Sequence, residues 1–194
     1  MEKITLLIFG RSGSGKGTQA KLLKKNLDFD FHITTGSLLR KEAEKDSFIA
    51  KKIKKVLEDG MLCPAWVSSH MWERFLIEEI ETNKENIIFD GVARRLEEAK
   101  YLDSVMEWFG REIIPIHINI TENEAVKRLK SRGRVDDTDE DIENRMHWYR
   151  TEVMRVFKYY KNEDRLIEID GMSSIEEVYE NLLTALNSID ETKK

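Results

Sequence analysis

Short apolar runs alternate along this chain with longer stretches in which apolar residues recur every three or four positions. The runs are rich in β-branched and aromatic residues, which is typical of buried strands. Five of them are predicted strands: residues 4–9, 31–33, 87–90, 113–120 and 166–169. The stretches between them favour helices, and residues 16–27, for example, place Ala20, Leu23 and Leu27 at helical spacing.

This alternation of strand and helix predicts an α/β fold with three layers, αβα. A central parallel sheet of about five strands, joined by right-handed crossovers, would be covered by helices on both faces. Residues 36–68 carry two helical patterns and no convincing strand, so we expect a helical insertion there. Residues 138–162 predict one helix or a kinked pair. Ligands of such folds bind at the carboxyl ends of the strands, where several polar segments of this chain should meet.

Composition restricts the class of protein. The 194 residues suit a single α/β domain, and 40% hydrophobic residues can fill its core. A net charge of −5 argues against general nucleic-acid binding, for which a basic face is expected. The single cysteine, Cys63, excludes an internal disulfide and a multi-cysteine zinc site. The chain shows neither a membrane-length apolar run nor a signal peptide, so we expect a soluble, cytoplasmic protein with no membrane partner.

Two features have a structural interpretation that we prefer to a functional one. The lysine-rich residues 51–55 could bind nucleic acid, but the spacing favours the solvated face of a helix. The buried stripe of that helix would consist of Phe48, Ile49, Ile53, Val56 and Leu57. The four histidines show no convincing metal-ligand spacing, and we treat them as structural: His32, His70, His117 and His147.

A glycine-rich segment at residues 10–18 lies between the first predicted strand and the first predicted helix. This order is typical of a phosphate-binding loop, because glycines let backbone N–H groups surround an anion. The helix N-terminus and Lys16 add positive charge. A hinge that binds nothing is disfavoured by the three glycines and the lysine at this spacing. Gly17 follows the lysine and the hydroxyl comes one residue later, at Thr18, which disfavours a GTPase-like magnesium site.

Three further segments carry charged groups that could act on phosphates. Arg40 follows the second strand by about one helical turn, and the third strand ends in Asp90, with Arg94 shortly after it. A carboxylate beside phosphates can orient Mg²⁺ through its water shell, and an arginine can bind a phosphoryl group with its planar fork. The third segment is a group of arginines around the acidic residues 136–141, which could also be a solvated charged turn.

Taken together, these segments resemble the nucleoside monophosphate kinases, and among them the short-lid adenylate kinases. The resemblance rests on the loop ending Gly-Lys-Gly-Thr-Gln, on Thr-Thr-Gly-Ser-Leu-Leu-Arg, on Asp-Gly-Val-Ala-Arg and on the arginine-flanked acidic turn, and it spans the chain from Ile4 to Gly171. It implies transfer of the γ-phosphoryl group of Mg·ATP to AMP, giving two ADP. It also implies Mg²⁺ as the cofactor with no zinc, ATP and AMP as partners, and a monomer. Closure of such a lid is established behaviour in adenylate kinases.

The resemblance implies a role for each matching residue. The ATP-binding residues would be Gly10, Gly13, Ser14, Gly15, Lys16, Gly17, Thr18, Arg128, Gly171 and Met172. The AMP-binding residues would be Thr35, Gly36, Arg40, Met61, Leu62, Cys63, Gly91, Arg94, Glu98, Arg134 and Arg145. The catalytic residues would be Lys16, Arg94, Arg128, Arg132, Arg134 and Arg145. Asp90 would hold magnesium through a bound water. Residues 34–67 would be the AMP-binding insertion and residues 130–140 the lid. Asp136 and Asp137 would hold the arginines of the lid in the closed state.

Four positions depart from the family pattern. Ser12 and Ala93 stand where prolines are usual, Ser37 where an aspartate is usual, and Glu98 where adenylate-type members have glutamine. An ionised glutamate can accept from the adenine amino group but cannot donate to a ring nitrogen, unless it is protonated or another donor intervenes. Two alternatives therefore stay open: a kinase for UMP or CMP, and a nucleotide-binding regulator with reduced catalysis.

Overall fold

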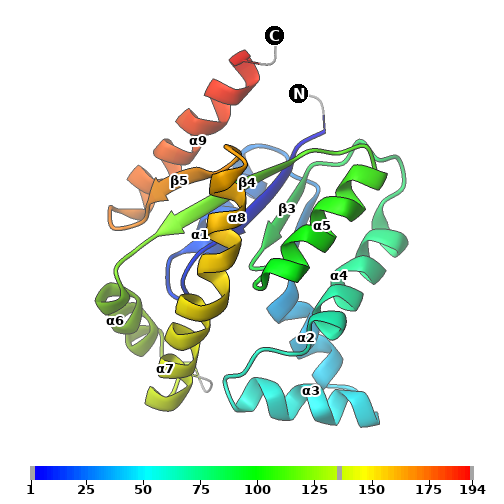
Figure 1. Cartoon of the computed structure of the whole chain (residues 1–194), viewed down its shortest axis with the longest axis vertical. Coiled ribbons are helices and arrows are strands. Elements are labelled where there is room, and N and C mark those ends of the chain that lie inside the picture. Colours follow the sequence, from blue (N-terminus) through cyan, green and yellow to red (C-terminus); the bar gives the residue numbers. More distant parts are fainter. Residues whose placement is uncertain (1–2, 135–136, 193–194) are drawn as a thin grey trace.

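A single parallel sheet forms the centre of the molecule (Figure 1). The computed structural model describes residues 3–134 and 137–192, and its five strands lie in the order β2-β3-β1-β4-β5. The strands are β1 (Thr5–Phe9), β2 (Phe31–Thr34), β3 (Ile87–Asp90), β4 (Ile113–Asn119) and β5 (Ile167–Asp170). All four strand pairings are parallel, which confirms the predicted sheet.

Helices connect the strands as the periodicity predicts. They are α1 (Lys16–Asn26), α2 (Thr35–Ala43), α3 (Phe48–Glu58), α4 (Ala65–Glu79), α5 (Leu96–Trp108), α6 (Glu122–Arg132), α7 (Asp139–Trp148), α8 (Met154–Asn162) and α9 (Ile175–Thr192). A short π-helical turn, η1 (Tyr149–Val153), joins α7 to α8. Of the two predictions for residues 138–162, one helix or a kinked pair, the structure therefore confirms the pair.

The strands are apolar at consecutive positions because both faces of the sheet are covered. Leu7 and Phe9 of β1 point to one face, where α4, α5 and α8 pack. Leu6 and Ile8 point to the other face, where α1 and α9 pack. Each of these four side chains is at most 2% exposed, and burying such a side chain contributes about 1.5–3 kcal/mol. The three-layer αβα arrangement is confirmed.

Two smaller helical units extend beyond the sheet, at the end of the molecule opposite both termini (Figure 1). One comprises α2, α3 and the start of α4 around Leu39 and Ile53. The other comprises α6 and α7 around Leu129 and Ile142. Each unit has its own small apolar cluster, separate from the clusters that cover the sheet.

The predicted buried stripe of α3 is wrong at its first two positions. Phe48 is 78% exposed and Ile49 is 37% exposed, whereas Ile53 is buried. The helix contacts its neighbours through Ala50 and Ile53, and Phe48 lies two positions before Ala50, on the opposite side of the helix. The lysines of residues 51–55 are exposed, as the solvated-face interpretation expects.

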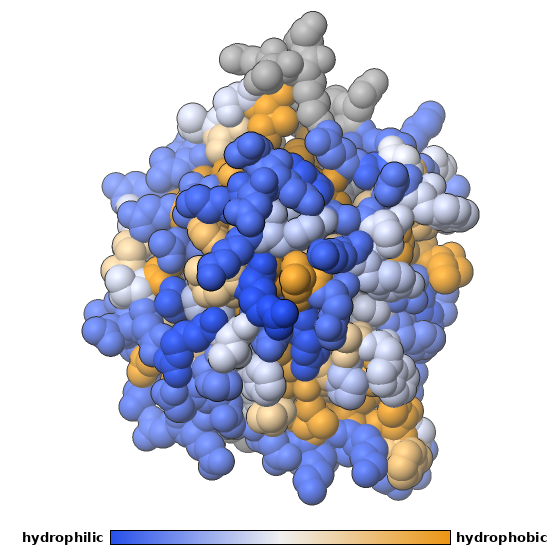
Figure 2. Space-filling view, viewed as in Figure 1, coloured by the Kyte–Doolittle hydropathy of each residue, from blue (hydrophilic) through white to orange (hydrophobic). Residues whose placement is uncertain are grey.

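The surface is mostly polar. Figure 2 shows a face covered by hydrophilic side chains with hydrophobic ones scattered among them, in keeping with 36% charged residues. None of the helices within residues 3–134 and 137–192 is both long and apolar enough to cross a membrane.

Candidate active site

A cleft of about 940 Å³ lies at the carboxyl ends of β1, β2 and β3. Its walls come from the loop before α1, the start of α2, the segment between α3 and α4, the loop before α5, and residues of α6, α7 and the turn after β5. Apart from Met172, every site residue that the sequence predicts lines this cleft. Met172 is 45% exposed, while its neighbours Gly171 and Ser173 face the cleft. Asp136 lies outside the described residues.

The glycine-rich loop takes a conformation that its glycines allow. Gly13 and Gly15 have φ of 86° and 90°, in the left-handed region that side chains avoid. A Cβ at Gly13 would also lie only 2.9 Å from the carbonyl oxygen of Ala125, so α6 approaches the loop closely. The loop ends at the N-terminus of α1, where unpaired backbone N–H groups and the helix dipole favour an anion.

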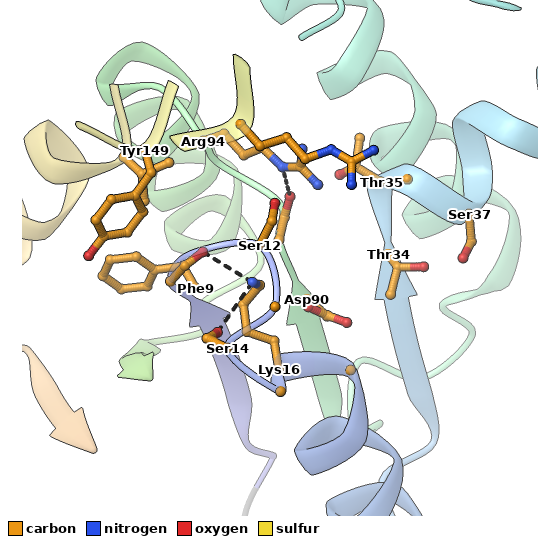
Figure 3. A pocket seen from close by; sticks show the side chains of 18 of the residues that line it. Phe9, Ser12, Ser14, Lys16, Thr34, Thr35, Ser37, Asp90, Arg94 and Tyr149 are labelled. Atoms are coloured by element: carbon orange, nitrogen blue, oxygen red, sulfur yellow. Dashed lines mark hydrogen bonds between the residues drawn. The ribbon is translucent and has the colours of Figure 1, made fainter. Parts of the chain in front are cut away.

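Lys16 folds back over this loop (Figure 3). Its Nζ donates to the carbonyl oxygens of Gly10 at 3.0 Å and of Arg11 at 2.7 Å, and lies 3.5 Å from Oγ of Ser14. Burial lowers the pKa of Lys16 to about 8, with nearby Arg94 and Arg132 acting in the same direction and Asp90 opposing them. The ammonium is thus a desolvated charge inside a loop that is built to surround an anion.

Asp90 ends β3 beside the loop. Its Oδ2 lies 3.3 Å from Nε2 of His32 on the neighbouring strand β2. A Cβ at Gly17 would lie 3.3 Å from the same oxygen, so a larger residue after Lys16 would crowd this carboxylate. His32, which the sequence analysis treats as structural, belongs to the cleft wall.

The start of α2 forms the opposite wall. The helix begins at Thr35, and the side chain of its N-cap residue, Thr34, makes no capping hydrogen bond. The hydroxyl of Thr35 is buried and has no hydrogen-bond partner within the described part of the chain. The guanidinium of Arg40 lies over Gly36, with Nη1 3.4 Å from where a Cβ would be. A buried hydroxyl without a partner among the described residues and a cation in the same wall are suited to an anionic ligand.

Arg94 lies between these two walls. Its Nε donates to the carbonyl oxygen of Gly91 at 3.1 Å, and burial lowers its pKa. Because α5 begins at Leu96, Arg94 precedes the helix and does not share a helical face with Glu98. Both side chains nevertheless line the cleft.

Glu98 caps its own helix. Its Oε2 accepts from the backbone N–H groups of Arg94 at 2.7 Å and Arg95 at 2.9 Å. Its other oxygen, Oε1, lies 3.4 Å from Nη1 of Arg95. Burial raises the pKa of Glu98, and these N–H groups and the guanidinium oppose the increase. Helix capping is a role that the sequence analysis did not assign to this residue.

The described part of the predicted lid is held by one carboxylate. The side chain of Asp137 is buried and accepts from Nε of Arg132 at 2.9 Å, Nη2 of Arg132 at 2.6 Å and Nη1 of Arg145 at 2.6 Å. The backbone N–H of Arg134 also donates to it, at 3.2 Å. These hydrogen bonds outweigh burial and lower the pKa of Asp137 to about 2. Three arginines that line the cleft thus share one buried anion.

The two small helical units meet across the cleft. The side-chain amide of Asn144 on α7 donates to the carbonyl oxygen of Asp59 at 3.4 Å. Next to it, Gly60 has φ of 63°, and a Cβ there would lie 2.6 Å from Oδ1 of Asp141 and 3.0 Å from its Cα. The turn after α3 and the first turn of α7 are therefore in close contact.

Several residues of the cleft wall are not predictable from the sequence. They are Arg95, Trp148 and Tyr149, which line the cleft without having been assigned to it from the sequence. Tyr149 does pack, since Cζ of Arg11 lies 4.0 Å from its ring centre and His117 bonds its hydroxyl at 2.9 Å. Their partners come from distant segments, so no local pattern predicts these contacts. The sequence offers one indication of a contact, the spacing of Arg95 and Glu98, because residues three apart can interact on a helix.

Comparison with known proteins identifies similar sequences over nearly the whole chain. A family model described as adenylate kinase matches residues 8–165. A protein named adenylate kinase from Azobacteroides pseudotrichonymphae is 33% identical over 187 residues, which cover 94% of this chain and 96% of that protein. The adenylate kinase of Parabacteroides distasonis is 33% identical over 191 residues (96% and 99%). That of Mycolicibacterium paratuberculosis is 36% identical over 182 residues (93% and 98%).

Proposed function

The chain belongs to the adenylate kinase family, and from that premise we propose that it transfers the γ-phosphoryl group of Mg·ATP to AMP, giving two molecules of ADP. The observation that carries the proposal is the set of cations along one cleft. They are Lys16, Arg40, Arg94, Arg128, Arg132, Arg134 and Arg145. Two phosphorylated substrates that meet end to end need cationic groups at both ends and at the point of transfer, and this cleft provides them.

The two ends of the cleft suit different substrates. The loop at residues 10–18 and Lys16 hold the phosphates of ATP, while Nη2 of Arg128 donates to the carbonyl oxygen of Gly171 at 3.0 Å beside the ATP base. Arg40, Arg94 and the unsatisfied hydroxyl of Thr35 hold the phosphate of AMP. We assign residues 34–67 as the AMP-binding insertion and residues 130–140 as the lid.

Phosphoryl transfer requires positioning and charge stabilisation more than proton transfer. Arg132, Arg134 and Arg145 surround the point between the two substrates and neutralise the charge that develops on the transferred group. Asp137 keeps Arg132 and Arg145 in place, so that little reorganisation is needed during the reaction. The lid also excludes water, which would otherwise accept the phosphoryl group.

The residues present fit a magnesium ion bound together with ATP. Mg²⁺ usually keeps several waters and takes one or two carboxylates plus substrate phosphates, so it needs no protein cage. Asp90 lies beside Lys16 and the loop, and the hydroxyls of Thr18 and Ser37 line the same cleft. When bound, the ion neutralises phosphate charge; Asp90 would hold its waters. Within residues 3–134 and 137–192, no three His, Cys, Asp or Glu side chains gather into a separate metal site.

Measuring ADP formation by the purified chain tests the proposal. ATP and Mg²⁺ are supplied with AMP, CMP or UMP in turn, and we expect two ADP per AMP consumed and a loss of activity with EDTA. The Lys16→Met variant, purified in the same way, controls for contaminating kinases. Preference for CMP or UMP would assign a pyrimidine kinase instead, and nucleotide binding without turnover would indicate a regulator. Light scattering after size-exclusion chromatography tests the expected monomer.

A further inference from the structure

We infer that Arg95 is a specificity-determining residue of the AMP site, which donates to N1 of adenine while Glu98 accepts from the adenine 6-amino group. The inference rests on the proposed function, since it concerns how AMP is recognised as the acceptor. Glu98 alone cannot meet both atoms of this edge of adenine. Arg95 lies next to Glu98 and carries N–H donors.

Arg95 is fixed by contacts with three separate segments. Its Nη1 donates to the carbonyl oxygen of Cys63 at 2.8 Å and to Oε1 of Glu98 at 3.4 Å. Its guanidinium carbon lies 5.9 Å from the ring centre of Trp148. The side chain is only 17% exposed, and Arg95, Cys63, Glu98 and Trp148 all line the cleft. A guanidinium held in this way adds a fixed donor to the wall at the AMP end.

The carboxylate of Glu98 has one oxygen left for a ligand. Oε2 is used by the two backbone N–H groups at the start of α5, so Oε1 is the atom that can accept from a base. An ionised carboxylate has no hydrogen to donate. Adenine presents a donor, the 6-amino group, next to an acceptor, N1. Glu98 therefore satisfies the amino group and leaves N1 without a partner.

The guanidinium next to Oε1 supplies the complementary group. A guanidinium carries five N–H donors. The hydrogen bonds that Arg95 makes to other described residues through its side chain use only Nη1. Donors on Nε and Nη2 therefore remain for a base. Together the two side chains offer one acceptor and one donor, the two functions that the amide of a single glutamine combines. This pairing leaves Glu98 ionised and requires no protonated carboxyl group.

Three nucleotides, used in turn as the phosphoryl acceptor, distinguish the hydrogen bond of Arg95 from that of Glu98. AMP has both groups, purine riboside 5′-monophosphate lacks the 6-amino group, and 1-deaza-AMP has a C–H in place of N1. We expect Arg95→Met to raise KM for AMP and for purine riboside monophosphate about tenfold, with KM for ATP unchanged. For 1-deaza-AMP the same substitution should have little effect, because no acceptor remains at that position.

A second substitution provides a rescue. Glutamine at position 98 would keep its oxygen on the two backbone N–H groups and direct its NH2 group to N1, so Arg95→Met combined with Glu98→Gln should recover most of the lost affinity for purine riboside monophosphate, which has N1 and no 6-amino group. Arg155→Met is the matched control, because this arginine is 59% exposed on α8 and lies outside the cleft wall. We expect it to leave every KM unchanged. Should Arg95→Met fail to fold, Arg95→Lys replaces it, with a smaller rise that shows the same dependence on N1.

Two results would overturn the inference. One is an unchanged KM for AMP in Arg95→Met; the other is an equal rise for AMP and 1-deaza-AMP, which would mean that Arg95 only supports the wall through Cys63. Both leave the proposed function intact. That function fails separately, if the unaltered chain forms no ADP from ATP and AMP.

Discussion

Nζ of Lys16 donates a hydrogen bond of 2.7 Å to the carbonyl oxygen of Arg11, within the loop that is proposed to surround the ATP phosphates. The ammonium therefore already lies at the anion site, and bound phosphate would exchange with these carbonyl partners. Lys16→Met should reduce kcat by at least ~10²-fold, because a positioned charge on the transferring group is lost. Steady-state kinetics measures this, with exposed Lys158→Met as the control. Near-normal turnover in Lys16→Met would remove the lysine from the mechanism.

The pKa of Lys16 predicts how ATP affinity depends on pH. Burial lowers this pKa to about 8, so the group loses its proton when the pH rises through 8. Bound phosphates favour the ammonium, so ATP binding should take up a proton in this range and KM for ATP should rise above about pH 8. Lys16→Arg, which stays protonated, is the comparison. A KM for ATP that is equally flat for both proteins up to pH 10 would contradict the assignment.

The two substrate sites predict different kinetic effects of arginine removal. Arg40→Ala should raise KM for AMP strongly, since we assign this cation of the cleft wall to the phosphate of AMP. Arg134→Ala and Arg145→Ala should lower kcat far more than they weaken AMP binding, because their charges act on the transferred group. Initial-rate measurements with each substrate varied separate KM from kcat. An unchanged KM for AMP in Arg40→Ala would contradict this assignment of the two sites.

The buried carboxylate of the lid predicts an acid-dependent loss of stability. The pKa of Asp137 is about 2, below the value of 3.8 for a free aspartate, so its contribution is complete above pH 4 and disappears as the pH falls through 2. Asp137→Asn should lower the free energy of unfolding at pH 7 by about 1–3 kcal/mol. The same substitution should also reduce the decrease in the free energy of unfolding between pH 4 and pH 2.

Urea unfolding at several pH values measures these differences. Asp139→Asn is the matched control, because its carboxylate pairs with Lys130 at 2.7 Å while being 84% exposed. We expect little change in that variant. Equal losses in the two variants would mean that burial of Asp137 among its arginines has no special effect.

The sequence was sufficient for the sheet and for most of the cleft because both depend on local patterns. Consecutive apolar residues such as Leu6 and Leu7 identify a strand that is covered on both faces, and a glycine-rich turn followed by Lys16 identifies the phosphate loop. The comparisons confirm the family resemblance, and it was this resemblance that predicted the AMP-binding residues. Ser37 keeps its place in the cleft wall, and its effect on magnesium stays a prediction.

The errors concern features that depend on neighbours distant in the chain. Phe48 fits a helical stripe, but no element of the described structure packs against it. Arg95 resembles an ordinary surface arginine until the fold brings the carbonyl of Cys63 and the ring of Trp148 beside it. The capping role of Glu98 depends on where α5 begins, because its side chain reaches the backbone N–H groups of Arg94 and Arg95 just before the helix.

The close contact between Gly60 and Asp141 restricts how this protein can be recombined with its relatives. A Cβ at residue 60 would collide with the backbone as well as the side chain of Asp141, so rotation of that side chain cannot relieve the overlap. The turn after α3 and the first turn of α7 must therefore be exchanged together in any chimera. An AMP-binding segment taken alone from a relative with a larger residue at position 60 would require this helix to shift.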